Sequence, residues 1–292
     1  MRPRLFWLSS RAIIAGGAAR DTPSESDVTG EPLLRAGIFL AVFAVLALAE
    51  LAAPFRASPD GKRQRWPGNL GLFVAGIVLG RVVLPAGAVG FAAYLEAQGI
   101  GLLNQGFLPF WLAVPIAVVL LDLAIYTQHV VFHHVPWLWR LHRVHHADTE
   151  LDVTTGIRFH PIEIGLSILI KLVVIAVLGA PALAVLIFEV LLNAGAMFSH
   201  ANLKLPDRVE RRLSWLIVTP GMHRVHHSAE RIDTDSNYGF NLAIWDRIFR
   251  THRPEPVPGA ENVVLGLGEW REPGEQRVDR LLTQPFRSPR EG

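Results

Sequence analysis

The sequence predicts an all-α fold, a polytopic membrane helical protein with a histidine-rich helical cap on the cytoplasmic side. Of the 292 residues, 50% are hydrophobic, and the mean hydropathy is +0.30, which is too apolar for most soluble domains. The cap is predicted by the histidines, because six of the chain's twelve lie between Asp122 and His146. In that stretch an apolar run turns abruptly into a cluster of imidazoles.

The composition also excludes several kinds of site. The chain has no cysteine, so disulfides, thiolate metal sites, iron–sulfur clusters and cysteine nucleophiles are excluded. Imidazole and carboxylate remain as metal ligands. The net charge is only +2, and the sequence pI of 9.3 reflects arginines spread along the chain, so no nucleic-acid partner is expected.

Five apolar runs, at residues 36–55, 70–94, 107–131, 162–178 and 183–198, account for the predicted spans. Each is long enough, or nearly so, to cross a bilayer as a helix. The second run contains Arg81 and Pro85, so it is either one kinked span or a span followed by an interfacial piece. The last two are near the lower length limit, which leaves open whether they cross fully or are re-entrant.

The charges between the runs predict the topology. Basic residues crowd the loop 56–65, a bias typical of the cytoplasmic side, whereas residues 95–106 contain no lysine or arginine and are expected on the opposite side. Residues 179–181, Gly-Ala-Pro, join the last two runs as a tight hairpin that returns the chain to the side it left. The histidines that follow the spans can therefore gather at one membrane face.

The histidines follow helical spacings. His129 and His133 are four residues apart and share one face if the third run stays helical. After Pro136 the pentapeptide HRVHH begins at His142, and the same pentapeptide recurs about eighty residues later, beginning at His223. One HxxHH motif would be weak evidence, but two identical copies are a strong signal of a metal site.

Neutral imidazoles bind borderline metals such as Fe, Zn or Mn. Eight spaced histidines are too many for one ion and suit two ions with open positions. His200, at the membrane edge, and His160 extend the set, whereas His134 and His252 are expected to be bystanders. The predicted metal ligands are His129, His133, His142, His145, His146, His160, His200, His223, His226 and His227.

A histidine ligand needs an acceptor for its second ring nitrogen. Asp122 lies seven residues before His129, and Asn193 stands in the same relation to His200. The further candidates are Asp148, Asp235 and Asp246. The alternative that any one of these side chains caps a helix or binds backbone remains open.

These motifs in this order resemble the fatty acid hydroxylase/sterol desaturase superfamily, over roughly residues 107–253. The motifs are Asp122-x3-Tyr126-x2-His129-x3-His133, Leu138-Trp139-x2-His142-x2-His145-His146, His160-Pro161-x-Glu163, His200-x-Asn202, His223-x2-His226-His227 and Asn237-Tyr238-Gly239. The resemblance implies an integral membrane enzyme with a histidine-ligated di-iron centre on the cytoplasmic side. Such an enzyme uses O2 and electrons to hydroxylate or desaturate a lipid.

Carried over to this sequence, the resemblance makes the eight spaced histidines the iron ligands, with His200 and His160 added and no catalytic residue beyond the metal centre. Two positions depart from the family pattern. Val130 stands where an arginine often follows the first histidine, and Arg250 replaces the glycine of the closing Phe-Gly-Thr motif. Neither touches a ligand position, so the departures concern substrate and redox partner.

The expected cofactor is two iron ions, which zinc can replace during overexpression. No dinucleotide fingerprint or cytochrome-like haem motif occurs in the sequence, so electrons are expected from a separate ferredoxin or reductase. The catalytic domain is expected at residues 33–253, between a mobile tail at 1–32 and a polar tail at 254–292. The identity of the lipid, and the choice between hydroxylation and desaturation, remain open.

A membrane metal transporter or metal-binding protein is the alternative function. Transporters place ligands near the bilayer midplane and usually include carboxylates. In this sequence the imidazoles fall at the ends of the apolar runs and in polar segments, which favours the enzyme.

Overall fold

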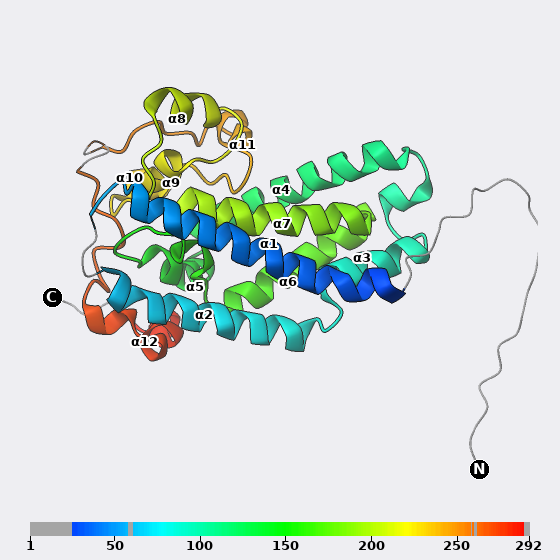
Figure 1. Cartoon of the computed structure of the whole chain (residues 1–292), viewed down its shortest axis with the longest axis horizontal. Coiled ribbons are helices and arrows are strands. Elements are labelled where there is room, and N and C mark those ends of the chain that lie inside the picture. Colours follow the sequence, from blue (N-terminus) through cyan, green and yellow to red (C-terminus); the bar gives the residue numbers. More distant parts are fainter. Residues whose placement is uncertain (1–24, 58–60, 258, 260–261, 289–292) are drawn as a thin grey trace, which may run out of the picture.

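The computed structural model describes residues 25–57, 61–257, 259 and 262–288, and within them the chain forms helices and no strand. The predicted all-α class is confirmed. Of the expected N-terminal tail, residues 1–24 lie outside the described residues, and the rest belongs to the first helix, α1 (Glu25–Ala52). Figure 1 shows the long helices running side by side along the longest axis.

Five helical segments among the described residues are long and apolar enough to cross a membrane, as predicted. The outer faces of these helices are also apolar, with Leu40, Val78 and Val173 each more than half exposed. Exposed aliphatic faces of this extent are unfavourable in water and suit hydrocarbon. The chain is therefore a multi-pass membrane protein. The helices that carry the segments are α1, α2 (Gly61–Val83), α4 (Phe110–His134), α6 (Pro161–Leu178) and α7 (Ala182–His200).

The second apolar run is broken into two helices. After α2 ends at Val83, the chain turns at Pro85, and α3 (Gly87–Ala97) begins. Small side chains on α3, α4 and α7, including Ala92, Ala117 and Ala184, are fully buried and allow these helices to pack closely. A 3-10 turn, η1 (Leu102–Gln105), then leads towards α4.

The predicted hairpin between α6 and α7 is present and depends on glycine. Gly179 caps α6 with a φ of +61°, a conformation that favours glycine. The turn also packs against Gly101, where an added Cβ would lie 2.3 Å from the Cα of Gly179. The hairpin therefore closes tightly and returns α7 towards the end of the bundle at which α6 began.

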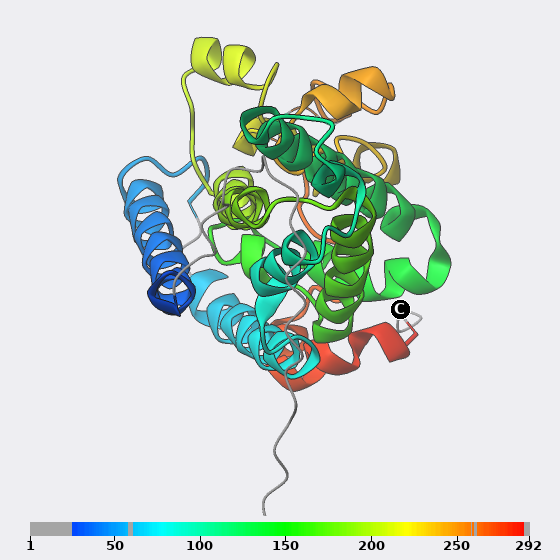
Figure 2. The same cartoon turned by 90° about the vertical axis from the view of Figure 1, so that its right-hand side faces the viewer.

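That end of the bundle carries the histidine-rich cap, as Figure 1 shows on its left side. Figure 2 looks at the bundle from its opposite end, with the long helices seen almost end-on. The placement of the cap on the cytoplasmic side stays a prediction. Its short helices are α5 (Pro136–His146), α8 (Asp207–Leu213), α9 (Pro220–His226), α10 (Arg231–Thr234), α11 (Ile244–Ile248) and α12 (Val278–Thr283), with 3-10 turns η2 (Thr155–Ile157), η3 (Pro273–Gln276) and η4 (Gln284–Phe286).

Residues 262–288, the longest described part of the C-terminal segment, fold back on the cap and do not extend as a tail. Leu281 of α12 is fully buried against Leu72 of α2 and Val144 of α5. Gly68 of α2 allows this approach, since an added Cβ would lie 2.0 Å from the carbonyl oxygen of Gln276. The Arg143 guanidinium also donates to the Gln284 carbonyl at 2.7 Å. These contacts tie the segment to both helices.

Candidate metal centre

Nine histidines converge in the cap, and all nine are buried. They form two groups, and within each group the potential ligand atoms all lie within 4.8 Å of one another. The first group is His129, His133, His142, His146 and His226, and the second group is His145, His200, His223 and His227. The two groups adjoin, because the stacked rings of His146 and His227 have centroids 4.4 Å apart.

Local sequence explains how α4 and α5 bring their histidines together. α4 continues through its last turn, which places His129 and His133 one turn apart on one face. Val135 is extended, with φ −94° and ψ 116°, and Pro136 occupies the first turn of α5, so the chain reverses between the two helices. His142 of α5 can then face α4.

The HRVHH pentapeptides divide their histidines between the groups. On α5, the first and last histidines are one turn apart and join the first group, while His145 points to the second. On α9, which Thr219 caps by accepting from the amide of Met222, His226 joins the first group. Its neighbours His223 and His227 join the second group.

The distances between ring nitrogens suit shared metal ions. In the second group the Nε2 atom of His200 lies 3.0 Å from Nε2 of His145 and 3.1 Å from Nε2 of His227. Two nitrogens that bind one ion at right angles, each at about 2.1 Å, are about 3.0 Å apart. In the first group, Nε2 of His129 lies 3.0 Å from Nε2 of His142 and 3.1 Å from that of His226.

Ring nitrogens without hydrogen-bond partners also support metal binding. Both ring nitrogens of His133 and of His146 are buried without a hydrogen bond. Buried polar atoms are rarely left so, because desolvation is not repaid. Both rings belong to the first group, and an ion bound there would take one nitrogen from each, so the residues present fit a metal ion.

Burial lowers the pKa of five cap histidines and keeps them neutral. Desolvation, reinforced by neighbouring imidazoles, lowers the pKa of His145, His146, His223 and His227 well below the ordinary value. For His226, burial lowers the pKa to about 3. Neutral imidazoles keep a free lone pair at physiological pH, as metal binding requires.

Glu163 is a carboxylate partner that the sequence reasoning did not single out. It lies in the first turn of α6, is buried, and accepts from Nδ1 of His142 at 2.6 Å. An acidic residue two positions after the His160-Pro161 pair, at the start of an apolar run, was the available signal. Such a contact fixes the ring orientation and raises the basicity of the other nitrogen.

In both groups, Nδ1 atoms of other histidines donate to backbone carbonyls. His129 donates to the Tyr238 carbonyl at 2.8 Å, and His226 donates to the Ser236 carbonyl at 2.7 Å. In the second group, His200 donates to the carbonyl of Ala196, one turn earlier in α7, at 2.6 Å. Each bond leaves Nε2 free to face the centre of its group.

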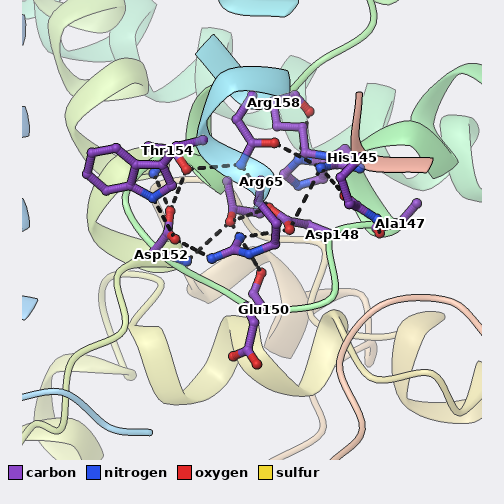
Figure 3. Close-up of polar contacts among 12 residues, drawn as sticks. Arg65, His145, Ala147, Asp148, Glu150, Asp152, Thr154 and Arg158 are labelled. Carbon is purple, nitrogen blue, oxygen red and sulfur yellow. Dashed lines mark hydrogen bonds and ion pairs between the residues drawn. The ribbon is translucent and has the colours of Figure 1, made fainter. Parts of the chain in front are cut away.

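His145 depends on a buried ion network, which Figure 3 shows. Its Nδ1 atom donates to the backbone carbonyl of Arg158 at 3.2 Å. The Arg158 side chain donates to Asn69 of α2 at 2.8 Å and to Gln276 of the C-terminal segment at 2.7 Å. Arg158 is fully buried, and burial lowers its pKa to about 10.

Asp148 is the centre of that network and contacts arginines instead of a histidine ring. It accepts from Arg65 of α2 at 2.7 Å and lies 3.7 Å from Arg158. Burial works to raise the pKa of Asp148, but the two guanidinium groups hold it below its ordinary value. Arg65 also pairs with Asp152, so the network joins α2 to the segment after α5.

Asp235 and Asp122 were also expected to accept from histidine rings, and only Asp235 lies near one. Asp235 lies 3.5 Å from Nδ1 of His133, which places it beside the first group. Asp122 does not bond His129; it accepts from the side chains of Asn241 at 2.9 Å and Trp245 at 2.8 Å. Asp122 therefore braces the chain that follows the Tyr238 carbonyl.

Asp246 has a similar bracing role, because it accepts from the backbone amides of Tyr238 at 2.7 Å and Gly239 at 2.8 Å. Asn193 bonds within its own helix and donates to the Glu189 carbonyl at 2.7 Å. Neither side chain contacts an imidazole in these hydrogen bonds.

The remaining histidines lie outside both groups. His160 caps α6: its Nδ1 accepts from the amide of Ile162 at 3.2 Å, and its Nε2 donates to the Leu282 carbonyl at 3.2 Å. Both of its ring nitrogens are therefore engaged. His134 is exposed on α4, and His252 contacts the Asn237 side chain at 3.2 Å.

Comparison with known proteins gives a family match. The fatty acid hydroxylase family model matches residues 114–251, a segment that contains both histidine groups. The chain is 31% identical over 158 residues to the ornithine lipid hydroxylase OlsE of Rhizobium tropici. This match covers 53% of this chain and 46% of that protein.

Alkylglycerol monooxygenases are further relatives. The protein of Xenopus tropicalis is 32% identical over 147 residues, and that of Homo sapiens is 28% identical over 151 residues; each match covers 50% of this chain and 31% of the relative. The chain thus spans less than half the length of these relatives. No solved structure matches the chain.

Proposed function

Because the chain belongs to the fatty acid hydroxylase/sterol desaturase superfamily, we propose that it is a membrane oxygenase that uses O2 and external electrons to hydroxylate or desaturate a lipid. One observation carries the proposal: nine buried imidazoles converge in two adjoining groups at one end of the membrane helices. Relatives that are named as hydroxylases and monooxygenases support the same reaction class.

The proposed cofactor is two iron ions, one in each histidine group, with zinc as a substitute when the protein is overexpressed. Bound iron supplies the O2 chemistry that breaking an unactivated C–H bond requires. His160 is left out of the proposed ligand set, since both of its ring nitrogens already have partners. The proposed ligands are the five histidines of the first group and the four of the second.

The residues around the imidazoles prepare them for this role. Glu163 and the carbonyls of Tyr238 and Ser236 hold Nδ1 protons, so the corresponding Nε2 atoms stay available as ligand atoms. Burial of all nine rings excludes water from the centre. A site at the end of membrane helices also lies where apolar substrates already partition.

We further propose that the cap faces the cytoplasm, where a separate ferredoxin or reductase supplies electrons. Arg56 follows the end of α1, and Lys62 and Arg63 lie in the first turn of α2. Both of these helix ends are at the cap end of the bundle, so the basic side chains support this orientation. We take residues 33–253 as the catalytic domain, with the packed segment 262–288 attached to it.

A paired measurement tests the oxygenase against a metal transporter. Purified protein with a reductase system and 18O2 should give a hydroxylated lipid that carries the label, or an unsaturated lipid with the label in water. Liposomes that contain the same preparation should take up no Zn2+, Mn2+ or Fe2+. Metal uptake that continues without O2 and reductant, and stops in His226→Ala, would overturn the enzyme in favour of transport.

A further inference from the structure

Two buried tyrosines flank the first histidine group, and the proposed reaction does not use them. The ring centroid of Tyr238 lies 5.1 Å from that of His133. It lies 5.7 Å from the rings of His129 and His226. Tyr126, in α4, meets the ring of Tyr238 edge-on, with centroids 6.5 Å apart. Both tyrosines are buried, and their rings form a continuous aromatic path that begins at the histidines.

The path continues from Tyr126 towards the outside of the protein. The ring of Phe249, which follows α11, stacks on that of Tyr126 with centroids 5.3 Å apart and an interplanar angle of 18°. Phe249 is 52% exposed. One aromatic side chain therefore separates Tyr126 from the protein surface along this contact.

The two phenol hydroxyls differ in their surroundings. Within the described residues the Tyr238 hydroxyl is buried without a hydrogen-bond partner. The Tyr126 hydroxyl lies 2.9 Å from Oγ1 of Thr251, and the Thr251 hydroxyl donates to the Asp246 carboxylate at 2.6 Å. A threonine hydroxyl has one proton to donate, and Thr251 gives it to Asp246. Tyr126 is therefore the donor in its bond with Thr251.

These bonds give the Tyr126 proton a defined route. Asp246 is fully buried, and the amides of Tyr238 and Gly239 hold its carboxylate in place. Burial raises the pKa of Asp246, so its carboxylate accepts a proton more readily. A proton that leaves Tyr126 can pass to Thr251 while the Thr251 proton passes to Asp246.

We propose that Tyr126 donates one electron through Tyr238 to the oxidised metal centre when no lipid consumes the oxidant. This assignment rests on the proposed function. Tyr126 loses one electron and one proton and becomes a neutral phenoxyl radical. The electron reduces the metal centre, and the proton moves to Thr251 as the Thr251 proton moves to Asp246. The external electron donor then returns one electron to Tyr126, and the proton returns from Asp246 by the same route.

A donor of this kind protects the metal ligands. Without a lipid, an oxidised centre would take electrons from the side chains nearest to it, which are the imidazoles of the first group. Oxidising a phenol that keeps its proton would leave a cation in a buried site, which is unfavourable. The bonds to Thr251 and Asp246 remove that penalty for Tyr126. Trp139, whose ring lies 5.0 Å from that of His133, is the rival electron donor.

Photo-oxidation of the zinc-loaded protein tests Tyr126 without turnover, since zinc undergoes no redox change. The chain has no cysteine, so a ruthenium photosensitiser can be attached at Ile248→Cys, an exposed position of α11. Illumination with persulfate should produce a tyrosyl radical, measured by EPR. The chain has three tyrosines, so the signal can be assigned: Tyr126→Phe should remove it, and Tyr94→Phe should keep it. Thr251→Val, which lacks the proton acceptor, should lower the yield about fivefold.

Mixing reduced, iron-loaded protein with O2 in the absence of lipid tests the link to the metal centre. Freeze-quenched samples should contain the same tyrosyl radical, which Tyr126→Phe should lack. Tyr238→Phe should lower its yield, because the ring that joins Tyr126 to the first group is then harder to oxidise. Over repeated cycles, Tyr126→Phe should lose bound iron and gain oxygen on histidine peptides faster than Tyr94→Phe does.

The proposal is overturned if the zinc-loaded protein forms no radical on Tyr126, or if the iron-loaded protein oxidises lipid but forms no such radical when lipid is absent. A tryptophan radical that Trp139→Phe removes would make Trp139 the donor instead. Failure of the proposed function looks different. Light then still produces the Tyr126 radical in the zinc-loaded protein, but iron, O2 and reductant give neither a radical nor a modified lipid. That result removes the oxidant, and with it the protective role.

Discussion

The two histidine groups use the same side chain but are braced in different ways. In the first group a buried carboxylate, Glu163, accepts directly from His142 at 2.6 Å, and Asp235 lies 3.5 Å from His133. In the second group, Nδ1 of His145 donates to the Arg158 carbonyl and Nδ1 of His200 donates to the Ala196 carbonyl. The ion network of Arg65, Asp148 and Arg158 supports this group through the Arg158 carbonyl, which accepts from His145.

This difference indicates which substitutions should weaken metal binding by each group. The carboxylate that holds His142 in the first group is one side chain, so a single conservative substitution can weaken that contact. In the second group, the carbonyl that holds His145 belongs to Arg158, and its position depends on the network of Arg65, Asp148 and Arg158, which joins α2, the segment after α5 and, through Gln276, the C-terminal segment. We therefore expect the two groups to fail separately and through different residues.

Removing one ligand from each group should have the largest effect. His226→Ala should remove the ion of the first group and His223→Ala that of the second, so metal content falls from about two to about one per chain. Lipid oxidation should be lost in both variants. The measurement is the time course of metal release to a chelator, in which each group should release its ion in a separate kinetic phase. Each variant should lack a different phase, whereas the control His252→Ala should show both. A His226→Ala protein that still holds two ions would break the comparison.

Breaking the ion network of Arg65, Asp148 and Arg158 should have the second largest effect. Arg65→Met leaves Asp148 buried with less compensating charge, so the free energy of unfolding in detergent should fall by about 3–5 kcal/mol. The release phase absent from His223→Ala should also become faster, because the network positions the carbonyl that holds His145. Arg277→Met is the control: it removes an exposed pair at 3.0 Å and should change stability by about 0–1 kcal/mol.

The pH dependence of Arg65→Met has a definite sign. In the wild type the pKa of Asp148 is held below its ordinary value, so its stabilisation is present above about pH 4 and is lost as the pH falls further. Without Arg65 the pKa of Asp148 should rise, and its protonation relieves the buried charge. The stability gap between variant and wild type should therefore narrow from pH 7 to pH 4; a constant gap would exclude Asp148 as the cause.

Spacing predicted which histidines come together better than it predicted how they divide into two groups. Nine of the ten histidines named from the sequence lie in the two groups, because helical repeats of three and four place them on neighbouring faces. The division of His142 and His145 between groups depends on how α5 is rotated against α4 and α9. That rotation is set by tertiary packing, which no local pattern encodes.

Long-range contacts explain what the sequence missed. Glu163 lies 21 residues from His142, and only the packing of α6 beside α5 brings them together. Asp122 was expected to reach His129 along α4, but it bonds Asn241 and Trp245 more than a hundred residues away. In the same way, the composition of the C-terminal segment did not reveal that Leu281 fits between α2 and α5.

Neutralising the carboxylate brace should have a moderate effect confined to the first group. Glu163→Gln keeps the shape but removes the charge beside His142, so metal affinity of that group should fall about 10–100-fold. Asp235→Asn should cause a smaller loss, since its contact is 3.5 Å long and its side chain is 28% exposed. Competition with a chelator measures both. An equal loss from both groups in Glu163→Gln would mean that the centre behaves as one unit.

The smallest expected effect comes from His160, the one predicted ligand that lies in neither group. Its Nδ1 caps α6 by accepting from the Ile162 amide, so His160→Ala should lower the free energy of unfolding by about 0.5–2 kcal/mol. His160→Asn, which retains a capping acceptor, should lose less. Both variants should keep about two ions per chain and both release phases, because neither histidine group loses a nitrogen. Loss of one ion in both variants, with the free energy of unfolding little changed, would instead show that His160 is a metal ligand.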